Sequence, residues 1–479
     1  IVAPTSDALP PGASRGPAID KDGSVIAERG TAHDYIPLSL LPKKVINAVI
    51  ENLGSPVFGN QAMNALVMIG ADTLSALDAA FYRSGQSTQM MLRVIQVIGR
   101  IGGQRAREIL WGKIDYPNKV IVSQVLLSLG ECGFKAGISQ ITRIKYAIEN
   151  DIADIRWNLS ALQEVEEEGF GHAIQIALRW EIQNDIEHVY MLLAMLYDTR
   201  SIQLVRENIE SGTPEGITYA VELLDVFLSE QLKQRVLPIV DDLSDSERIS
   251  RLDVFYPRIR LDHKLILKFI INRDFTQANR WTKACVLFQI GIQKIDDFTL
   301  DLIAQLFNPD PLIFEVAAWS LYQISPEEYY KHVVRLGKVK NKELDNLIIH
   351  SRKMTAFEKI LFFEKLQIFE TIPGITLSFL ADMSEEFRLT KDQSFALEQL
   401  GNEYFYLIMS GEIAYYRDQK LMNRFYEGQF IGELASRQGE GKPTIVAHAE
   451  VVLLKFRKDQ FYELLSDNNR LADQIINYV

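Results

Sequence analysis

The stretch MMLRVIQVIG, residues Met90–Gly99, shows the pattern that decides the fold of most of this chain. Its apolar residues recur every three or four positions, which is typical of one face of an α-helix. The same pattern ends at Gly70 in QAMNALVMIG and at Gly130 in VIVSQVLLSLG, so that the glycines are almost evenly spaced. TKACVLFQIG, ending at Gly291, follows most of the same frame. A period of about 30 residues predicts a stacked array of helical repeats.

Each repeat is expected to contain one helix, a glycine-containing turn and a second helix. Asp72–Tyr82 and Gln104–Ile114 are two expected second helices. A helical pair this short cannot bury both of its apolar faces alone, so neighbouring pairs must stack. The pattern resembles HEAT repeats, most clearly in NPDPLIFEVAAWSLYQI (Asn308–Ile324), where a polar turn precedes a helix with small residues. An irregular helical bundle with an accidental register is the alternative.

The pattern changes near Met354. The segment Met354–Thr390 has the composition of two or three short helices. Three β-rich runs follow, separated by turn residues, at Tyr404–Arg417, Leu421–Phe430 and Thr444–Phe456. Short strands at such spacing predict a small antiparallel roll or barrel. The segment Lys458–Val479 is helical in pattern again, so helices are expected on both sides of the roll.

The predicted fold class is therefore α+β and multidomain, with an α-solenoid of HEAT-like hairpins followed by a jelly-roll-like β-roll with flanking helices. Residues 1–34 are dominated by Pro, Gly, Ser and Ala without a visible period, which predicts a flexible linker. The predicted domains are a linker at 1–34, the solenoid at 35–350 and the C-terminal domain at 351–479.

The C-terminal segment resembles the cyclic nucleotide-binding domain family over roughly the last quarter of the chain. LIMSGEI (Leu407–Ile413) resembles a strand–turn signature of that family, and EGQFIGELA (Glu427–Ala435) resembles its phosphate-binding cassette. TAFEKILFFEKLQIFETIPG (Thr355–Gly374) resembles its N-terminal helices. The resemblance implies a β-roll that binds a cyclic nucleotide, although the glycine-rich loop is also compatible with an ordinary turn.

The cassette has a chemistry that can be stated from its residues. A short helix that starts near Gly432 would present unpaired N–H groups to an anion, and the glycine allows close approach. The resemblance implies that Glu433 accepts a hydrogen bond from a ribose hydroxyl. The candidate phosphate- and ribose-binding residues are Ile431, Gly432, Glu433, Leu434, Ala435, Lys442 and Thr444.

The sequence departs from the family where an arginine clamps the cyclic phosphate. That position falls on Lys442 or Gly441, and lysine cannot provide the planar, bidentate contact of arginine. Arg437 lies in the same loop, and Gln399 stands where the family usually has glycine. Only a short final helix follows the roll. Two alternatives remain, which are a degenerate domain that binds no cyclic nucleotide tightly and a true pocket for a cyclic nucleotide or another anion.

The composition and the absence of certain sequence motifs argue against several other functions. The net charge is −12, from 51 basic and 63 acidic residues, and the sequence has no long basic run, so nucleic-acid binding is not expected. The histidines and cysteines show no HExxH, HxxxH or CxxC spacing, which predicts no metal site. No paired acid–base spacing, GxSxG or Walker motif occurs, so we expect no catalytic residues and no enzymatic activity.

The expected location is the cytoplasm, because Cys132 and Cys285 fall in apolar helical stretches and no signal-peptide pattern opens the sequence. The segment Tyr219–Leu252 resembles one found where HEAT repeats and a cyclic nucleotide-binding-like domain follow a major-facilitator-type, nucleotide-transporter-like membrane domain. The chain opens with Ile1 rather than Met. We therefore expect a piece of a longer or processed polypeptide, with a membrane domain upstream and this part on the cytoplasmic face.

Two functional hypotheses follow. The first is a regulatory or sensory module, in which a ligand at the C-terminal domain biases the solenoid, or the reverse. The second is a protein-interaction scaffold, in which the solenoid surface binds a protein partner and the roll binds no nucleotide. An enzymatic alternative, based on HEAT-like arrays that assist chromophore attachment, has no reactive group to support it.

Overall fold

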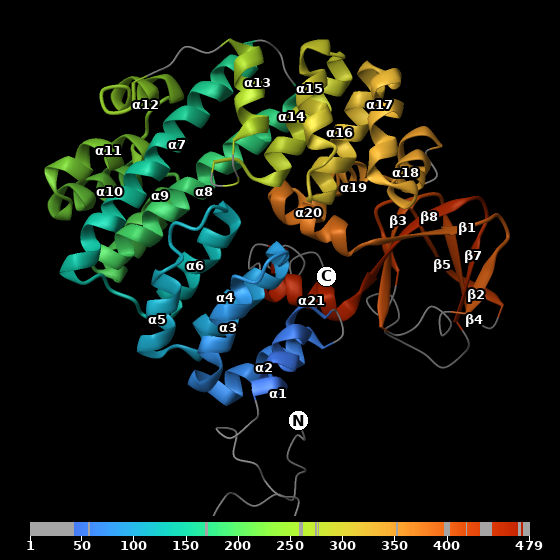
Figure 1. Ribbon diagram of the computed structural model, residues 1–479, viewed down its shortest axis with the longest axis horizontal. Coiled ribbons are helices and arrows are strands. Elements are labelled where there is room, and N and C mark those ends of the chain that lie inside the picture. Colours follow the sequence, from blue (N-terminus) through green and yellow to red (C-terminus); the bar gives the residue numbers. More distant parts are fainter. Residues whose placement is uncertain are drawn as a thin grey trace, which may run out of the picture.

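The computed structural model describes residues 43–472, except 56–57, 168–170, 258–261, 274, 276, 351–352, 397–402, 418, 432–442 and 468–470. The predicted linker at 1–34 thus lies outside the described residues. From Lys43 onward the chain forms a long helical region, followed by a β-sheet domain with helices on both sides (Figure 1). The predicted α+β, multidomain fold class is confirmed.

The helical region contains helices of between 7 and 27 residues. They are α1 (Lys43–Glu51), α2 (Gly59–Ile69), α3 (Leu74–Phe81), α4 (Thr88–Ile101), α5 (Gly103–Trp111), α6 (Lys119–Glu131), α7 (Ile141–Glu167), α8 (His172–Leu196), α9 (Thr199–Glu210), α10 (Pro214–Phe227), α11 (Glu230–Val240), α12 (Asp245–Leu252), α13 (His263–Asn272), α14 (Arg280–Gln293), α15 (Thr299–Gln305), α16 (Pro311–Ile324), α17 (Pro326–Val333) and α18 (Lys338–Leu344).

These helices follow an arc (Figure 1), in which helices alternate between two layers. The helices α2, α4, α6, α8, α14 and α16 pack one against the next and form one layer. Stacking in chain order is interrupted after α8, because α11 and α12 pack on α7 before α14 returns to α8. The apolar repeat found in the sequence lies in the layer that continues through the arc, since that layer must be buried on two sides.

The glycines of the sequence repeat do not all occupy turns. Gly70 begins a 3-10 turn with φ +79°, as expected, whereas Gly99, Gly130 and Gly291 lie inside α4, α6 and α14. The repeat glycine is therefore not always the turn residue, although the predicted glycine-containing turn is present between α4 and α5, where Gly102 has φ +66°. At Gly99 and Gly291 the physical reason is close helix packing, because a Cβ atom there would lie 2.8 Å from the Cβ of Ser128 and Ser320, respectively.

This contact recurs at the same sequence separation, from Gly99 on α4 to Ser128 on α6 and from Gly291 on α14 to Ser320 on α16. At both helix crossings a side chain on the second helix, or just after its end, donates a hydrogen bond to a backbone carbonyl of the first helix. The Cys132 thiol lies 3.3 Å from the Gly99 carbonyl oxygen, and the Ser320 hydroxyl donates to the Leu287 carbonyl at 2.8 Å. The helical period thus places equivalent small residues at equivalent helix crossings.

We expect Gly99→Ala to destabilise the chain and Gly130→Ala to stabilise it. Alanine at Gly99 must displace Ser128, and overpacking of this kind costs about 1–3 kcal/mol. Gly130 is exposed with open space around it, so alanine there gains about 0.5–1 kcal/mol of helix propensity. Chemical denaturation of the two variants measures the difference, and Gly99→Ala/Ser128→Gly is expected to recover most of the loss. Equal effects at both positions would contradict the close packing.

The C-terminal domain begins with α19 (Ala356–Glu364) and α20 (Gly374–Met383), and α21 (Lys458–Asp467) follows its last strand. Between them lie two four-stranded antiparallel sheets, with the strand orders β1-β8-β3-β6 and β2-β7-β4-β5. The strands are β1 (Glu385–Leu389), β2 (Ser394–Ala396), β3 (Tyr404–Ser410), β4 (Ile413–Arg417), β5 (Lys420–Phe425), β6 (Phe430–Ile431), β7 (Pro443–Ala447) and β8 (Val451–Arg457).

The strand β3 shows why the first sheet is apolar on both faces. Tyr406 and Ile408 point into the roll, where the second sheet contributes Ile413 and Ile445. The intervening residues Phe405, Leu407 and Met409 belong to the same core as the helices. Alternate residues of a strand point to opposite faces, so a sheet placed between helices and a second sheet needs apolar residues at nearly every position.

The sequence pattern predicts the later strands of the domain but not the first two, β1 and β2. The turn between β3 and β4 lies at Gly411, with φ +94°, as the strand–turn signature indicated. The strand β1, however, falls inside the segment predicted to be helical throughout. Its partner is β8, at the far end of the domain, where Leu389 pairs with Val451. No local pattern reveals such a pairing, because β1 is only five residues long and mostly polar.

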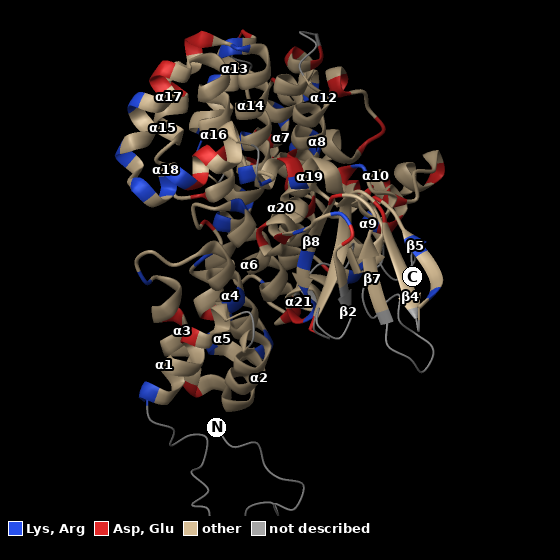
Figure 2. Cartoon of the chain, turned by 90° about the vertical axis from the view of Figure 1, so that its right-hand side faces the viewer, with Lys and Arg blue, Asp and Glu red and all other residues tan. Residues whose placement is uncertain are grey.

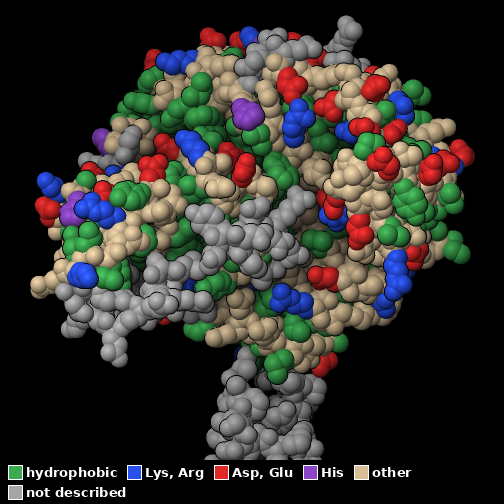
Figure 3. All heavy atoms as spheres, turned by 180° about the vertical axis from the view of Figure 1, so that it is seen from behind, with side chains coloured by type: hydrophobic (Ala, Val, Ile, Leu, Met, Phe, Trp, Pro, Cys, Tyr) green, Lys and Arg blue, Asp and Glu red, His purple; other side chains and the backbone are tan. Residues whose placement is uncertain are grey.

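Charged residues of both signs are interspersed over the described helices in Figure 2. On the opposite side from Figure 1, apolar, acidic and basic side chains also alternate over the described part of the surface (Figure 3). Among the described residues, no helix combines the length and the apolar composition needed to cross a bilayer.

Candidate functional site

The predicted phosphate-binding cassette connects the two sheets of the roll. Its N-terminal side is the turn at Gly428, which has φ +83° and donates from its N–H to the Ile408 carbonyl at 2.8 Å. The Ile408 N–H in turn donates to the Gln429 carbonyl at 3.0 Å, and β6 then pairs with β3. The chain resumes at β7, which belongs to the other sheet.

The structure describes two of the seven candidate site residues. Ile431 pairs with Tyr406 on β3, is 2% exposed and packs in the interior of the roll. Thr444 pairs with Tyr416 on β4 and with Ala396 on β2, and its side chain is half-buried. Gly432, Glu433, Leu434, Ala435 and Lys442 lie outside the described residues, as do Gln399, Arg437 and Gly441. Their roles therefore stay predictions.

The roll interior beside β6 is apolar and aromatic. Tyr406 is 4% exposed, and its ring centroid lies 6.2 Å from that of Phe387. Burial raises the pKa of Tyr406 to about 12, with a further contribution from the nearby Tyr404 and Glu385. The Tyr406 hydroxyl is therefore neutral at physiological pH, so it can act inside the roll only as a neutral hydrogen-bond donor or acceptor.

The other face of the same sheet packs on helices and makes a second contact region. Phe363 of α19, Phe369, and Phe461 of α21 lie against the aromatic residues of β3, β6 and β8, with the Phe405 and Phe461 centroids 4.7 Å apart. In Figures 1 and 2, α21 lies between the roll and α4, on the side where the arc of helices begins. A displacement of β6 would therefore directly change the packing contacts of the flanking helices.

The flanking helices α19 and α20 are joined to the helical region by a buried aromatic cluster. Trp281 of α14 is 1% exposed, stacks on Phe357 of α19 at 5.0 Å between centroids, and packs against Gly374 of α20. A Cβ atom on Gly374 would overlap the indole ring. Phe288 of α14 completes the cluster, 4.4 Å from Phe357. We call Trp281, Phe288, Phe357 and Gly374 the junction.

Polar contacts surround the junction. Arg280 of α14 bridges Asp310, at 2.9 Å, and Asp382 of α20, at 2.5 Å. Glu315 of α16 accepts a hydrogen bond from the Ala356 N–H at the start of α19, at 3.0 Å. Burial raises the pKa of Glu315 and of Asp382, and the adjacent donors counteract this in part. Charged groups on α14 and α16 therefore hold both flanking helices of the C-terminal domain.

Glu364, the last residue of α19, has a partly buried carboxyl whose pKa is raised to about 7 by loss of solvation. The folded state therefore favours the protonated form, so its stabilising contribution is complete below pH 4.5 and is lost as the pH rises through about 7. Relative to Glu364→Gln, the wild type is expected to lose on the order of 1 kcal/mol between pH 4.5 and 8, after allowance for partial exposure.

Urea denaturation at several pH values measures this effect, and the exposed Glu343→Gln controls for the loss of one negative charge. Parallel pH profiles for wild type and Glu364→Gln would contradict the assignment to Glu364.

Comparison with known proteins agrees with this geometry. The family model described as the cyclic nucleotide-binding domain matches residues 388–468, which include the whole predicted cassette. No curated protein matches the chain.

Solved structures resemble part of the chain at low sequence identity, as three examples show. The cAMP-bound PfPKA-R (141–441) is 18% identical, with a TM-score of 0.22, over 29% of this chain and 50% of that one. The sensor domain of the transcriptional regulator DNR from Pseudomonas aeruginosa is 19% identical, with a TM-score of 0.22, over 26% and 87%. The regulatory domain of Toxoplasma gondii PKA with cAMP is 15% identical, with a TM-score of 0.23, over 29% and 56%.

The two facing sheets, the turn at Gly411, the helices on both sides and the family match over residues 388–468 all concern the same segment. The chain therefore carries a C-terminal cyclic nucleotide-binding domain after a large helical region.

Proposed function

We propose that this chain is a non-enzymatic regulatory module, in which a degenerate cyclic nucleotide-binding domain is coupled to a HEAT-like helical scaffold. The observation that carries the proposal is the junction, which joins the helices flanking the domain to α14 through a buried aromatic cluster. A domain that only capped the helical region would not need α20 fixed by an ion pair to α14 and α19 fixed by a hydrogen bond to α16 as well.

The helical scaffold is proposed to be HEAT-like because its small-residue contacts repeat. Gly99 faces Ser128 and Gly291 faces Ser320, each across neighbouring helices of one layer. Such a layer can pass a displacement from one hairpin to the next, since packed helices shift as units. A ligand alters the scaffold only if it binds two arrangements of the chain with different affinity.

The degenerate character of the site rests on Lys442. In the family that the chain resembles, an arginine at this position holds the cyclic phosphate through two parallel hydrogen bonds. Lysine supplies the charge without that geometry, and hydrogen bonds to charged groups contribute about 1.5–3 kcal/mol. Low affinity for cAMP and cGMP follows, with the remaining binding provided by Glu433 and by backbone N–H groups near Gly432.

We also propose that the chain works next to a membrane transporter-like domain, on its cytoplasmic face. Support for this comes from the resemblance of Tyr219–Leu252, which spans most of α10, α11 and α12. These helices lie where stacking in chain order is interrupted. Mass spectrometry of the native protein, isolated from membrane and supernatant fractions, tests the attachment: a full-length product without hydrophobic spans would contradict it.

Lys442→Arg is expected to tighten the binding of cAMP by about 10- to 100-fold, because it restores the bidentate contact. Isothermal titration calorimetry of the full chain with cAMP and cGMP measures the change. Glu433→Ala in the same background should abolish the gain, and Lys420→Arg on the exposed strand β5 serves as the matched lysine-to-arginine control.

If saturating nucleotides bind neither the wild type nor Lys442→Arg, the sensory proposal fails. The chain would then be an interaction scaffold whose helical surface binds a protein partner, and a pull-down with the full chain as bait would be the next test.

A further inference from the structure

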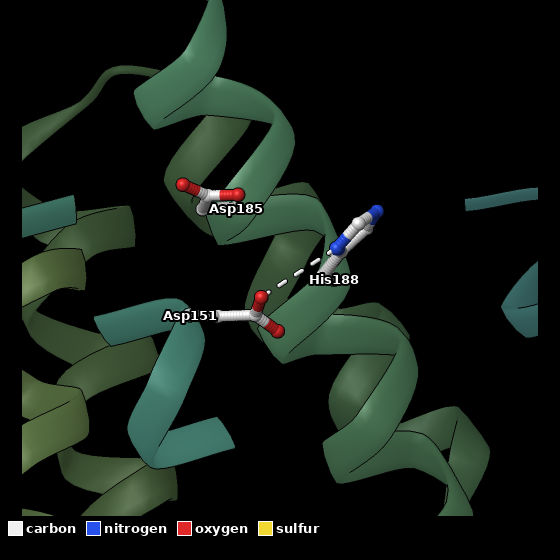
Figure 4. Close-up of side chains that lie close together, drawn as sticks. All are labelled: Asp151, Asp185 and His188. Atoms are coloured by element: carbon white, nitrogen blue, oxygen red, sulfur yellow. Dashed lines mark ion pairs between the residues drawn. The ribbon is translucent and has the colours of Figure 1, made fainter. Parts of the chain in front are cut away.

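The longest helices of the chain, α7 and α8, share a buried polar cluster that the proposed function does not use. Asp151 of α7 and Asp185 and His188 of α8 each place one ligand atom within 4.8 Å of the others (Figure 4). Asp185 and His188 are 0% and 1% exposed, whereas Asp151 is partly exposed and opens the cluster to solvent. We call these three residues the α7–α8 cluster.

The orientation of His188 is fixed from outside the cluster. Ser123 of α6 donates its hydroxyl hydrogen to the Lys119 carbonyl at 3.0 Å, and its oxygen lies 2.6 Å from Nε2 of His188. If the hydroxyl hydrogen is used in this way, Nε2–H of His188 donates to Ser123, and the Asn184 amide nitrogen lies further off, at 3.4 Å. In that tautomer Nδ1 carries no hydrogen and can act as a ligand atom on the side of Asp151.

That arrangement places two electron-rich atoms together. Nδ1 of His188 and Oδ1 of Asp151 are 3.7 Å apart, which is too long for a hydrogen bond. Figure 4 shows the ring and this carboxylate turned toward each other, with Asp185 on the neighbouring turn of α8. In the tautomer with an unprotonated Nδ1, a cation between these two atoms would remove their repulsion.

Asp185 provides a second, independent indication that the cluster binds a cation. One of its carboxylate oxygens forms an ion pair with Lys119, but Oδ2 is buried and accepts no hydrogen bond from any described residue. Buried carboxylate oxygens are normally satisfied, because an unpaired buried charge is costly. The Oδ2 atom is thus available to a cation without displacement of Lys119.

The charges around the cluster are also out of balance. Four carboxylates, those of Asp151, Asp154, Glu181 and Asp185, interact within this region with two cations, Lys119 and Arg273. If all four were ionised, the excess would be two negative charges, which either protons on the buried carboxyls or one divalent ion could neutralise.

We propose that the α7–α8 cluster binds one divalent transition-metal ion, through Asp151, Asp185 and Nδ1 of His188. One imidazole with two carboxylates suits Zn²⁺ or Mn²⁺ and disfavours Ca²⁺ and Mg²⁺, which prefer oxygen ligands alone. Ligands about 2.0–2.2 Å from a tetrahedral ion lie about 3.4 Å apart. The His188–Asp151 separation of 3.7 Å is close to this value, and the three ligand atoms, which lie within 4.8 Å of one another, must move closer together to bind the ion. Ser123 acts as the outer partner that orients the histidine.

The site links α7 to α8 in the middle of the helical region, so its role is structural or regulatory. It departs from the expectation of no metal site, which rested on spacing along the sequence. Spacing did not reveal the cluster, because Asp151 lies on a different helix from Asp185, far from it in sequence. The signal that could have helped is the DxxH spacing of Asp185 and His188, which puts both on one helix face.

The test uses the full chain, first stripped of metal with EDTA and then titrated with Zn²⁺, Mn²⁺ and Mg²⁺. We expect one equivalent of Zn²⁺ to bind and to raise the midpoint of thermal unfolding by roughly 2–5 °C, with little effect of Mg²⁺. Co²⁺ should bind to the same site and give visible absorption bands that report a nitrogen and oxygen ligand set.

Matched variants make the assignment specific. Asp151→Asn and His188→Gln are expected to weaken Zn²⁺ binding by at least about 100-fold, and Ser123→Ala by about 10- to 100-fold. His332→Gln removes another histidine that has an acidic neighbour, Glu328 at 3.2 Å, and should leave binding unchanged.

Asp151→Asn is the decisive variant, because its partly exposed side chain can be replaced without burying a new group. The proposal is overturned if the wild type binds none of the three ions, or if Asp151→Asn binds Zn²⁺ as tightly as the wild type does. Absence of binding together with a positively charged His188, seen in ¹⁵N spectra of the imidazole, would instead assign the missing charge to a proton.

Discussion

Trp281→Ala is expected to destabilise the chain by about 3–5 kcal/mol and to release the C-terminal domain from the helical region. The indole of Trp281 is 1% exposed. From its position on α14 it stacks on Phe357 of α19 and packs against Gly374 of α20, so it connects three helices. Truncation of a buried tryptophan removes these contacts and leaves a cavity that the surrounding helices cannot fill completely.

The consequence for function follows from the position of the junction. Hydrogen exchange is expected to increase in α19, α20 and the helix-facing side of β3, beyond what the lower global stability explains. Trp111→Ala is the matched control, since Trp111 stacks on Phe134 at 5.3 Å in the first part of the arc. If the two variants changed exchange in the C-terminal domain equally, the junction would not be the connection between the two parts.

Lys119→Met is expected to cost about 3–5 kcal/mol when measured in EDTA. Lys119 is 4% exposed and forms an ion pair with Asp185, which is fully buried, and lies 3.9 Å from Glu181. Burial lowers the pKa of this ammonium, but the carboxylates of Asp185 and Glu181 more than compensate, and its pKa is raised overall. Removal of one partner from a buried pair leaves the other charge without compensation, which is more harmful than removal of both.

The double variant Lys119→Met/Asp185→Asn tests this explanation. It should recover at least half of the loss, because the orphaned carboxylate is then neutral. Thr282 and the Asn279 N–H both donate to Glu181 at 2.7 Å, so that carboxylate keeps partners in every variant. Additive losses in the double-mutant cycle would show that Lys119 acts through packing of its methylene chain instead.

The helical array and the β-roll could be predicted because their signals are local. The apolar frame that ends at Gly99 and Gly291 specifies which face of each helix is buried, and buried faces must stack. The turn at Gly411 and the β-rich runs on either side of it likewise predict antiparallel strands. These features depend on near neighbours along the chain, so a single sequence contains them.

The missed features depend on partners that are distant in the sequence. β1 exists because β8 offers it a free edge, and Gly99 is small because Ser128 of the next helix approaches it. Of the seven predicted site residues, Ile431 lies on β6 and Thr444 on β7, and the ligand-binding roles of all seven stay predictions.

The sequence by itself determined the helical period, the change of pattern near residue 354, the β-rich runs that follow from Tyr404 onward and the likeness of the last quarter to a cyclic nucleotide-binding domain. Only the tertiary structure decided that Asp151 meets Asp185 and His188, and that Trp281 reaches Phe357 and Gly374. The physical reason is that periodicity records which face of an element is buried, whereas the identity of the group across the interface depends on how whole helices stack.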